Sequence, residues 1–338
     1  MNHFKIMAYD EITRRRFVQT MAGAGIISIA GCTDQLEGQL GEEQQFPSQK
    51  IEMVCPWAAG GGTDRTSRKI AELAGNHLDT SFYVTNKTGG TGSVGFNSVA
   101  DADPNGYTVG ITTVELCIIS HLGVSDITPK ALKPVMQYNF DPASITVRED
   151  APYGTIQEFV THAKDNPGTI KVSNSGTGSI WHLSAAGFAQ EANIDIKHIG
   201  YDGGSPATKA VINGEVQATA ASPAEVAPQV KDGPLKVLSI MGRERIDLFP
   251  EVPTLKESGF DFTLGAWRGL SVPSETSDDR TSTLHDTYKS VYDSDAFKSF
   301  MTKNGFRQVY RGPDEYGTFL SSEYDRFKKI IEQLDISK

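Results

Sequence analysis

Two glycine-containing turns hold the residues of this 338-residue chain that are best suited to binding chemistry. Residues 57–64 read Trp-Ala-Ala-Gly-Gly-Gly-Thr-Asp, and residues 175–179 read Ser-Gly-Thr-Gly-Ser. Glycine leaves the backbone N–H groups uncovered, and the serine and threonine hydroxyls add further donors. A carboxylate accepts about four hydrogen bonds, so either turn suits an anion. An ordinary structural turn between a strand and a helix fits the same residues.

Each turn lies where a strand is expected to end and a helix to begin. The apolar strand 51–55 ends at Pro56, which has no amide hydrogen to donate within a sheet. Thr63 or Asp64 can then cap the helix that follows. The strand 170–174 leads in the same way into the second turn. Because a helix start combines unpaired amides with the positive end of the helix dipole, both turns favour negative charge.

Strands and helices alternate from about residue 50, which predicts an α/β fold. Ligands of such folds bind beyond the carboxyl ends of the strands. The two turns lie far apart in sequence, so we expect two lobes that face each other across a cleft, each lobe a mainly parallel sheet flanked by helices. Extended segments at 132–138 and 144–147 would cross between the lobes. Lobe I is expected to comprise 50–142 and 265–338, and lobe II 143–264.

The first 31 residues have the features of an export signal. Thr13-Arg-Arg-Arg-Phe-Val18 is close to a twin-arginine motif, an apolar run follows, and Ile29-Ala-Gly-Cys32 reads as a lipobox. We expect residues 1–31 to be removed, Cys32 to carry lipid, and the polar segment 32–49 to be a tether. A transmembrane anchor is the alternative, although the apolar run is shorter than the roughly 20 residues that a span needs. The protein would then be exported and lipid-anchored, in the periplasm or at the cell surface.

Composition argues against several classes of function. The formal net charge is -10, whereas nucleic-acid binding needs clustered positive charge. Besides Cys32, only Cys55 and Cys117 occur. They could form a disulfide outside the cell. Two buried thiols are favoured, because Cys55 lies in an apolar strand. No CxxC motif or His/Cys cluster indicates a metal, and no cofactor is expected. Residues 90–95 match G-x-G-x-x-G, but this dinucleotide motif is weak without a strand directly before it.

Further candidate residues lie at other strand ends and near the helix starts. Glu115 would suit an amine or hydroxyl of a ligand, and Arg268, with Trp267, could meet a ligand's far end, although an exposed arginine is the commoner explanation. Asp64 would repel an anion, so we expect it to point away and cap its helix. For His182, packing or capping is the alternative to ligand contact. The residues expected to bind ligand are Trp57, Ala58, Gly61, Gly62, Thr63, Asp64, Thr113, Ser175, Gly176, Thr177, Gly178, Ser179, His182, Tyr201, Asp202 and Ser222.

Six segments occur in a characteristic order: PWAAGGGTD, VTNKTGGTGSVG, DPNGYTVGI, AKDNPGTIKVSNSGTGSIWHL, IGYDGGSPATKAVINGEV and RIDLFPEVPTLKESGF. As an ordered set they resemble the substrate-binding proteins of tripartite tricarboxylate transporters, the Bug or TctC-like family. The resemblance runs from about residue 51 to 272 and more loosely to the end of the chain.

This resemblance implies a two-lobed solute-binding protein of the periplasmic-binding-protein (Venus flytrap, type II-like) fold. Such a protein, expected to be a monomer, captures a small organic carboxylate (a di- or tricarboxylate or a related acid) and delivers it to a membrane permease. In the family, the loops corresponding to 57–64 and 175–179 grip one ligand carboxylate through backbone amides, hydroxyls and ordered water. Trp57 replaces the usual phenylalanine, and Cys55 a common aliphatic residue, so the pocket wall would be reshaped.

Two other functions remain open at this point. A sensory receptor of the same fold would contact a signalling partner instead of a permease. A secreted α/β enzyme would need a nucleophile with its base and orienting group, or a metal, and the sequence indicates neither. The binding interpretation fails if the turns at Gly61 and Gly176 lie on opposite outer surfaces with no gap between the lobes.

Overall fold

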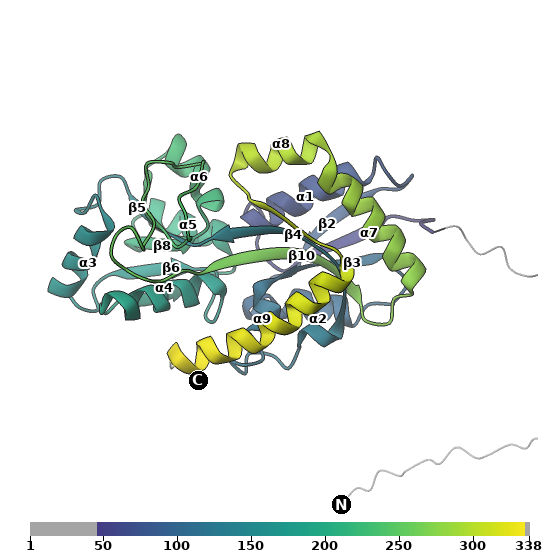
Figure 1. Ribbon diagram of the computed structural model, residues 1–338, viewed down its shortest axis with the longest axis horizontal. Helices are drawn as coiled ribbons and strands as arrows, with labels where there is room; N and C mark the ends of the chain where they lie inside the picture. The colour runs from purple at the N-terminus through teal and green to yellow at the C-terminus, as the bar shows by residue number, and fades with distance from the viewer. Residues whose placement is uncertain (1–45, 335–338) are drawn as a thin grey trace, which may run out of the picture. The chain divides into compact units, whose positions relative to one another are not determined.

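The computed structural model describes residues 46–334. The predicted signal at 1–31, the lipidated Cys32 and the tether up to residue 45 lie outside the described residues. Within the described part, the chain forms two α/β lobes, each built on one sheet, as expected (Figure 1).

The first lobe is built on a six-stranded sheet with the order β11-β4-β10-β3-β1-β2. Its strands are β1 (Ile51–Cys55), β2 (Phe82–Asn86), β3 (Thr108–Thr113), β4 (Leu132–Pro142), β10 (Gly265–Pro273) and β11 (Gln308–Arg311). Its helices are α1 (Gly62–Ala74), α2 (Ser93–Ala100), α7 (Asp278–Asp293), α8 (Asp295–Asn304) and α9 (Pro313–Leu334), with short 3-10 turns η1 (Gly90–Gly92), η2 (Val114–Cys117) and η3 (Pro129–Ala131).

The second lobe is built on a five-stranded sheet with the order β7-β6-β8-β5-β9. Its strands are β5 (Ser144–Arg148), β6 (Lys171–Asn174), β7 (Lys197–Gly200), β8 (Ala218–Ala221) and β9 (Leu235–Ile240). Its helices are α3 (Ile156–Asp165), α4 (Ile180–Ala192), α5 (Gly204–Ile212) and α6 (Pro223–Lys231).

Both sheets are mixed, with a parallel half and an antiparallel half. Strand β1 pairs in parallel with β2 and β3, and β6 pairs in parallel with β7 and β8. The expected parallel pairing is therefore found in the half of each sheet that carries a glycine turn. The antiparallel pairs involve β4, β5, β9 and β10, the strands at which the chain passes from one sheet to the other.

Strands β4 and β10 lie side by side and connect the lobes (Figure 1). They pair from Gly265 opposite Pro142 to Pro273 opposite Leu132. Just beyond this ladder, the Ala143 amide donates to the Leu264 carbonyl at 2.9 Å. Two paired crossing strands make a narrow link, which is the geometry of a hinge.

Local sequence signals predicted most elements, with a few errors at their ends. Helix α1 begins at Gly62 and its N-cap residue is Gly61, so the expected cap at Thr63 or Asp64 is wrong. The stretch after β3, expected to be a short helix, is reduced to the 3-10 turn η2. The C-terminal helices α8 and α9 are separated by a longer interruption than expected around residue 311. This interruption contains β11, which joins the edge of the first sheet.

The glycine run at 90–95 has a packing role. A Cβ atom at Gly95 would lie 2.7 Å from Cβ and 2.8 Å from Cα of Pro56, so only glycine lets α2 approach the start of the first turn this closely. Gly95, the last glycine of the G-x-G-x-x-G pattern, thus lets α2 pack closely against Pro56, directly before the first turn.

The two remaining cysteines lie inside the folded part of the chain. Cys55 and Cys117 are both free and fully buried, which confirms the interpretation as two buried thiols. Burial raises the pKa of the Cys55 thiol to about 12, so it stays protonated. Between residues 46 and 334, no helix has the length and apolar character needed to cross a bilayer.

Candidate functional site between the two lobes

A small cavity lies between the lobes and is lined by both of them. Its volume is about 20 Å³, which is room for roughly one water molecule. All three tryptophans of the chain, Trp57, Trp181 and Trp267, are in its wall. The other lining residues are Gly61, Gly62, Thr63, Thr113, Glu115, Ser175, Ile180, Gly204, Glu225, Ala266 and Arg268.

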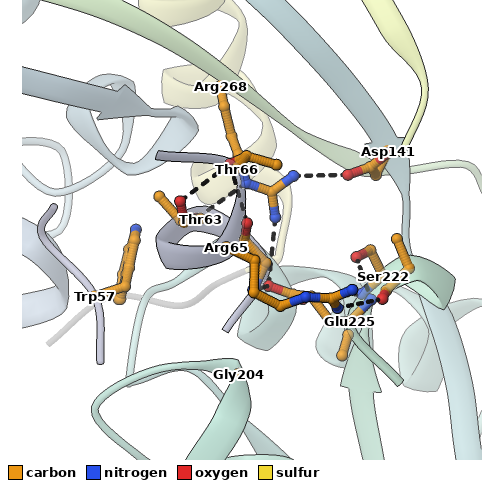
Figure 2. Close-up of polar contacts among 12 residues, drawn as sticks. Trp57, Thr63, Arg65, Thr66, Asp141, Gly204, Ser222, Glu225 and Arg268 are labelled. Atoms are coloured by element: carbon orange, nitrogen blue, oxygen red, sulfur yellow. Dashed lines mark hydrogen bonds and ion pairs between the residues drawn. The ribbon is translucent and has the colours of Figure 1, made fainter. Parts of the chain in front are cut away.

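Arg268 on β10 is the charged centre of the site and is only 2% exposed (Figure 2). Its Nε donates to Oγ1 of Thr63 at 3.0 Å, and its Nη1 donates to Oδ2 of Asp141 at 2.6 Å. Its Nη2 donates to Oε1 of Glu225 at 3.3 Å. Burial alone would lower the pKa of the guanidinium, but the two carboxylates raise it, so Arg268 is a cation. The explanation as an exposed arginine is therefore wrong.

Glu225 reaches this centre from the second lobe. It lies in the first turn of α6, where its Oε2 accepts from the Ser222 amide while Oγ of Ser222 accepts from the Glu225 amide. This capping box leaves Oε1 free to accept from Arg268 and, at 3.3 Å, from the amide of Gly62 in the first lobe. A Cβ atom at Gly62 would lie 2.7 Å from Cγ of Glu225, so glycine is required for this approach.

Glu115 reaches across the cavity in the opposite direction. It lies in η2 of the first lobe and is 2% exposed. One carboxylate oxygen accepts from the Thr113 hydroxyl, and the other accepts at 3.0 Å from the amide of Ile180, the first residue of α4 in the second lobe. Nε1 of Trp57 donates to the same Thr113 hydroxyl at 3.3 Å. Burial raises the pKa of Glu115, and its hydrogen bonds partly oppose that rise.

The two glutamates form a reciprocal arrangement. The start of α1 in the first lobe receives Glu225 from the second lobe, and the start of α4 in the second lobe receives Glu115 from the first. Unpaired amides and the helix dipole favour a negative charge at each place. Both predicted anion cradles are thus real helix starts that face the opposite lobe, and each holds a carboxylate of the chain itself.

Half of the first turn lies at this cavity. Trp57 and the segment 61–63 line it, whereas Ala58 does not, although its amide donates to the Asp202 carbonyl of the second lobe at 3.1 Å. Asp64 points away, as expected: its carboxylate accepts from the Gly60 amide at 2.9 Å and pairs with Arg68. It stabilises the turn from behind without being the helix cap.

Of the second turn, Ser175 alone is in the cavity wall. Thr177 is exposed, and its carbonyl accepts from the Thr91 hydroxyl of the first lobe at 2.7 Å. Ser179 is the N-cap of α4 and accepts from the His182 amide. Gly176 and Gly178 shape the loop between them without lining the cavity.

The remaining predicted residues support the wall from outside it. Nδ1 of His182 accepts from the Gly178 amide at 2.9 Å, so this ring orders the loop and does not line the cavity. Ser222 caps α6, and Asp202 is exposed, with Tyr201 packed partly buried beside it. Their ligand contact stays a prediction, and the structure favours a supporting role for each of the four.

Sequence reasoning missed Glu225, Gly204, Ile180, Trp181 and Ala266 as cavity residues. The Ser222-Pro-Ala-Glu225 segment carries a capping-box signature after a strand, and this signal could have located the start of α6. It could not have shown that the second carboxylate oxygen reaches the other lobe. In the described residues, no group of three or more His, Cys, Asp or Glu side chains is placed to hold a metal ion.

We predict that Arg268→Met destabilises the protein strongly. The change leaves Asp141 and Glu225 buried without their cation, a loss that typically costs about 3–5 kcal/mol. Arg245→Met is the matched control, because its pair with Glu257 is on the surface and is worth less than about 1 kcal/mol. Urea unfolding followed by tryptophan fluorescence gives both free energies, and equal losses in the two variants would contradict the assignment of Arg268 as the charged centre.

We also predict that His182 makes stability depend on pH. Burial, with a smaller contribution from His198, lowers the pKa of His182 from 6.5 to about 4. The unfolded chain therefore takes up this proton first, and stability is lost as the pH falls from about 6.5 to about 4, by at most about 3 kcal/mol. His182→Asn keeps an acceptor for the Gly178 amide but does not titrate. Its unfolding free energy should fall less over this range than that of the wild type; parallel pH curves would show that His182 is not responsible.

Comparison with known proteins identifies the family. Residues 66–336 match the tripartite tricarboxylate transporter family receptor, TctC. A TctC solute-binding protein from Polaromonas, solved without ligand, is 33% identical, with 85% of this chain and 99% of that chain covered and a TM-score of 0.63.

Two solved structures from Rhodopseudomonas palustris share the fold. MatC, with bound malate, is 24% identical and has a TM-score of 0.80, with 85% of this chain and all of that chain covered. A second protein, solved with adipate, is 23% identical and has a TM-score of 0.82, with 86% of this chain and 99% of that chain covered. The matched family is described as a receptor and the Polaromonas relative as a solute-binding protein, in agreement with the expectation of a binding protein from the sequence. The chain belongs to the TctC family of tripartite tricarboxylate transporter receptors.

Proposed function

We propose that the protein captures a small dicarboxylate between its two lobes, outside the cytoplasmic membrane, and delivers it to a tripartite tricarboxylate-type permease. The observation that carries this proposal is the pair of helix starts at Gly62 and Ile180, which face one cavity from opposite lobes with a buried arginine beside them. Helix-start amides and a guanidinium are the groups that bind carboxylates without a metal. Malate in MatC and adipate in the second relative support a four- to six-carbon diacid here.

Binding of such an acid requires the lobes to separate. The cavity has room for about one water molecule, so a diacid enters only when the cleft opens. The paired strands β4 and β10 provide the link about which the lobes would turn. A ligand that contacts both helix starts then favours the closed form by the contacts that it makes only there.

The tryptophans strengthen the case for a cleft with selectivity for the ligand's carbon chain. Trp57 is 7% exposed and Trp267 is fully buried, and each is fixed by a hydrogen bond from its Nε1, to Thr113 and to Glu323 respectively. Rigid aromatic walls exclude water and pack against the methylene groups of a diacid. One carboxylate of the ligand would be bound at the helix starts, and its carbon chain would lie between the rings.

Export and lipid attachment at Cys32 belong to the same proposal. They are supported by the order of the twin-arginine motif, the apolar run and the lipobox in the first 32 residues. A receptor that is tethered beside its permease would deliver solute at a high local concentration. The mass of the mature N-terminal peptide decides whether the lipid is present.

We predict that the purified protein binds malate and adipate and discriminates against their half-amides. Replacing one carboxylate by a neutral amide removes one of the two charges of the ligand and should weaken binding by about tenfold or more. Titration calorimetry, with tryptophan fluorescence as a second readout, measures each affinity. A panel of di- and tricarboxylates on which nothing binds, or a bound acid that is turned over, would refute the proposed function.

A further inference from the structure

We propose that a groove beside the link between the lobes is the docking site for an acidic segment of the membrane permease, and that docking there weakens the hold on the solute. This inference rests on the proposed function, because it names the part of the receptor that would meet the permease. The groove shares none of its lining residues with the ligand cavity.

The groove has a volume of about 530 Å³ and is lined by both lobes. It lies where the chain passes between the sheets, and Pro142 and Gly265, which pair with each other in the ladder of β4 and β10, are in its wall. A Cβ atom at Gly265 would lie 2.9 Å from Cα of Pro142, so glycine lets the two strands approach this closely. A partner seated here would touch both lobes at the link about which they turn.

Three arginines from separate segments gather in this groove, although the formal net charge of the chain is -10. Arg243 follows β9 in the second lobe, whereas Arg307 precedes β11 and Arg326 lies on α9 in the first. Glu244 is the one acidic residue of the lining. Within the described part of the chain, neither Arg243 nor Arg307 forms an ion pair with a carboxylate. Carboxylates of another molecule therefore complement this surface.

An acidic peptide segment fits this groove better than a small acid or a lipid surface does. All three arginines are exposed, and an ion pair at such a place is worth less than about 1 kcal/mol. A small acid can pair with one or two of them, whereas a segment with several carboxylates can pair with all three, so that the weak contacts add. The groove also has room for inserted side chains, which a lipid surface does not supply.

Arg307 connects the groove to the ligand cavity. Its amide donates at 2.9 Å to Oδ1 of Asp141, and Oδ2 of Asp141 accepts from Arg268 at 2.6 Å. The ring centroid of Phe306, the residue before Arg307, lies 5.6 Å from the guanidinium carbon of Arg268. A shift of the segment 306–307 would therefore change the surroundings of the cation in the cavity wall.

Arg326 makes a second connection. Its Nη1 donates to Oε1 of Glu323 at 2.9 Å, and Oε2 of Glu323 accepts from Nε1 of Trp267 at 3.1 Å. Trp267 is in the wall of the ligand cavity. Because 49% of the Arg326 side chain is exposed, a carboxylate from outside can reach it and compete with Glu323. That competition would alter the contact that fixes the Trp267 ring.

Both connections predict that docking and solute binding oppose each other. A docked acidic segment brings negative charge towards the network of Arg268, which also attracts the carboxylate of a solute. It also loosens the support of one tryptophan of the cavity wall. Linkage makes the effect mutual, so the solute weakens docking by the same factor. The permease would thus meet a receptor whose affinity for solute falls on contact.

The test uses the full-length protein and a short oligoglutamate peptide, with an oligoglutamine peptide of the same length as its control. Arg243→Gln, Arg307→Gln and the double variant remove charge from the groove, and Glu244→Gln removes its acidic residue. Arg148→Gln is the matched control, because it removes the same charge from the end of β5 that lies away from the link. Fluorescence anisotropy measures peptide binding, and calorimetry measures malate and adipate affinity with and without the peptide.

We expect the oligoglutamate peptide to bind the wild type and Arg148→Gln equally. It should bind each single arginine variant about threefold more weakly and the double variant about tenfold more weakly. Glu244→Gln should bind it about threefold more tightly, a gain that misfolding cannot produce. A saturating amount of the peptide should lower the affinity of the wild type for malate by about fivefold.

Equal peptide binding by the wild type and the double variant, or a malate affinity that the peptide leaves unchanged, would overturn the inference and leave the proposed function intact. Two other results would also overturn it. Binding of phosphatidylglycerol vesicles in place of the peptide, lost in the double variant, would assign the groove to a lipid surface. A second malate per protein, lost in the double variant, would assign it to a small acid. If the wild type without peptide binds neither malate nor adipate, the proposed function itself fails.

Discussion

The buried guanidinium of Arg268 is the constraint on which the site depends. A cation with 2% exposure is stable only beside fixed negative charge, and here Asp141 supplies one carboxylate from the neighbouring strand while Glu225 supplies the other from the second lobe. The Asp141 carboxylate therefore lies beside Arg268 within the first lobe, whereas the position of the Glu225 carboxylate depends on how the two lobes meet. The position of the second lobe is thereby coupled to the electrostatics of the cavity.

That coupling suits a protein that must bind and then release an anion. Helix-start amides attract a carboxylate without a permanent counter-ion, so the contact is reversible. Opening the cleft would separate Glu225 from Arg268 and leave the guanidinium with Asp141 as its buried partner. A ligand carboxylate beside Arg268 would then be favoured.

Sequence patterns located the cradles because their signals are local. Pro56 ends a strand, the glycines bare the amides, and Ser179 caps a helix, and all three are readable within a few residues. The opposing carboxylates were not found, because Glu225 is 163 residues from Gly62 and Glu115 is 65 residues from Ile180. No local pattern encodes which partner a long side chain meets across a cleft. For Arg268, the sequence left contact with a ligand and an exposed position as alternatives. Its burial follows from β10 lying between β3 and β4, which only the assembled sheet reveals.

A crystal structure of the protein with malate tests the central claim most directly. The account predicts that malate lies between the two lobes, with one of its carboxylates beside the helix starts at Gly62 and Ile180. A structure in which malate binds outside this cavity, or does not bind at all, would contradict the account.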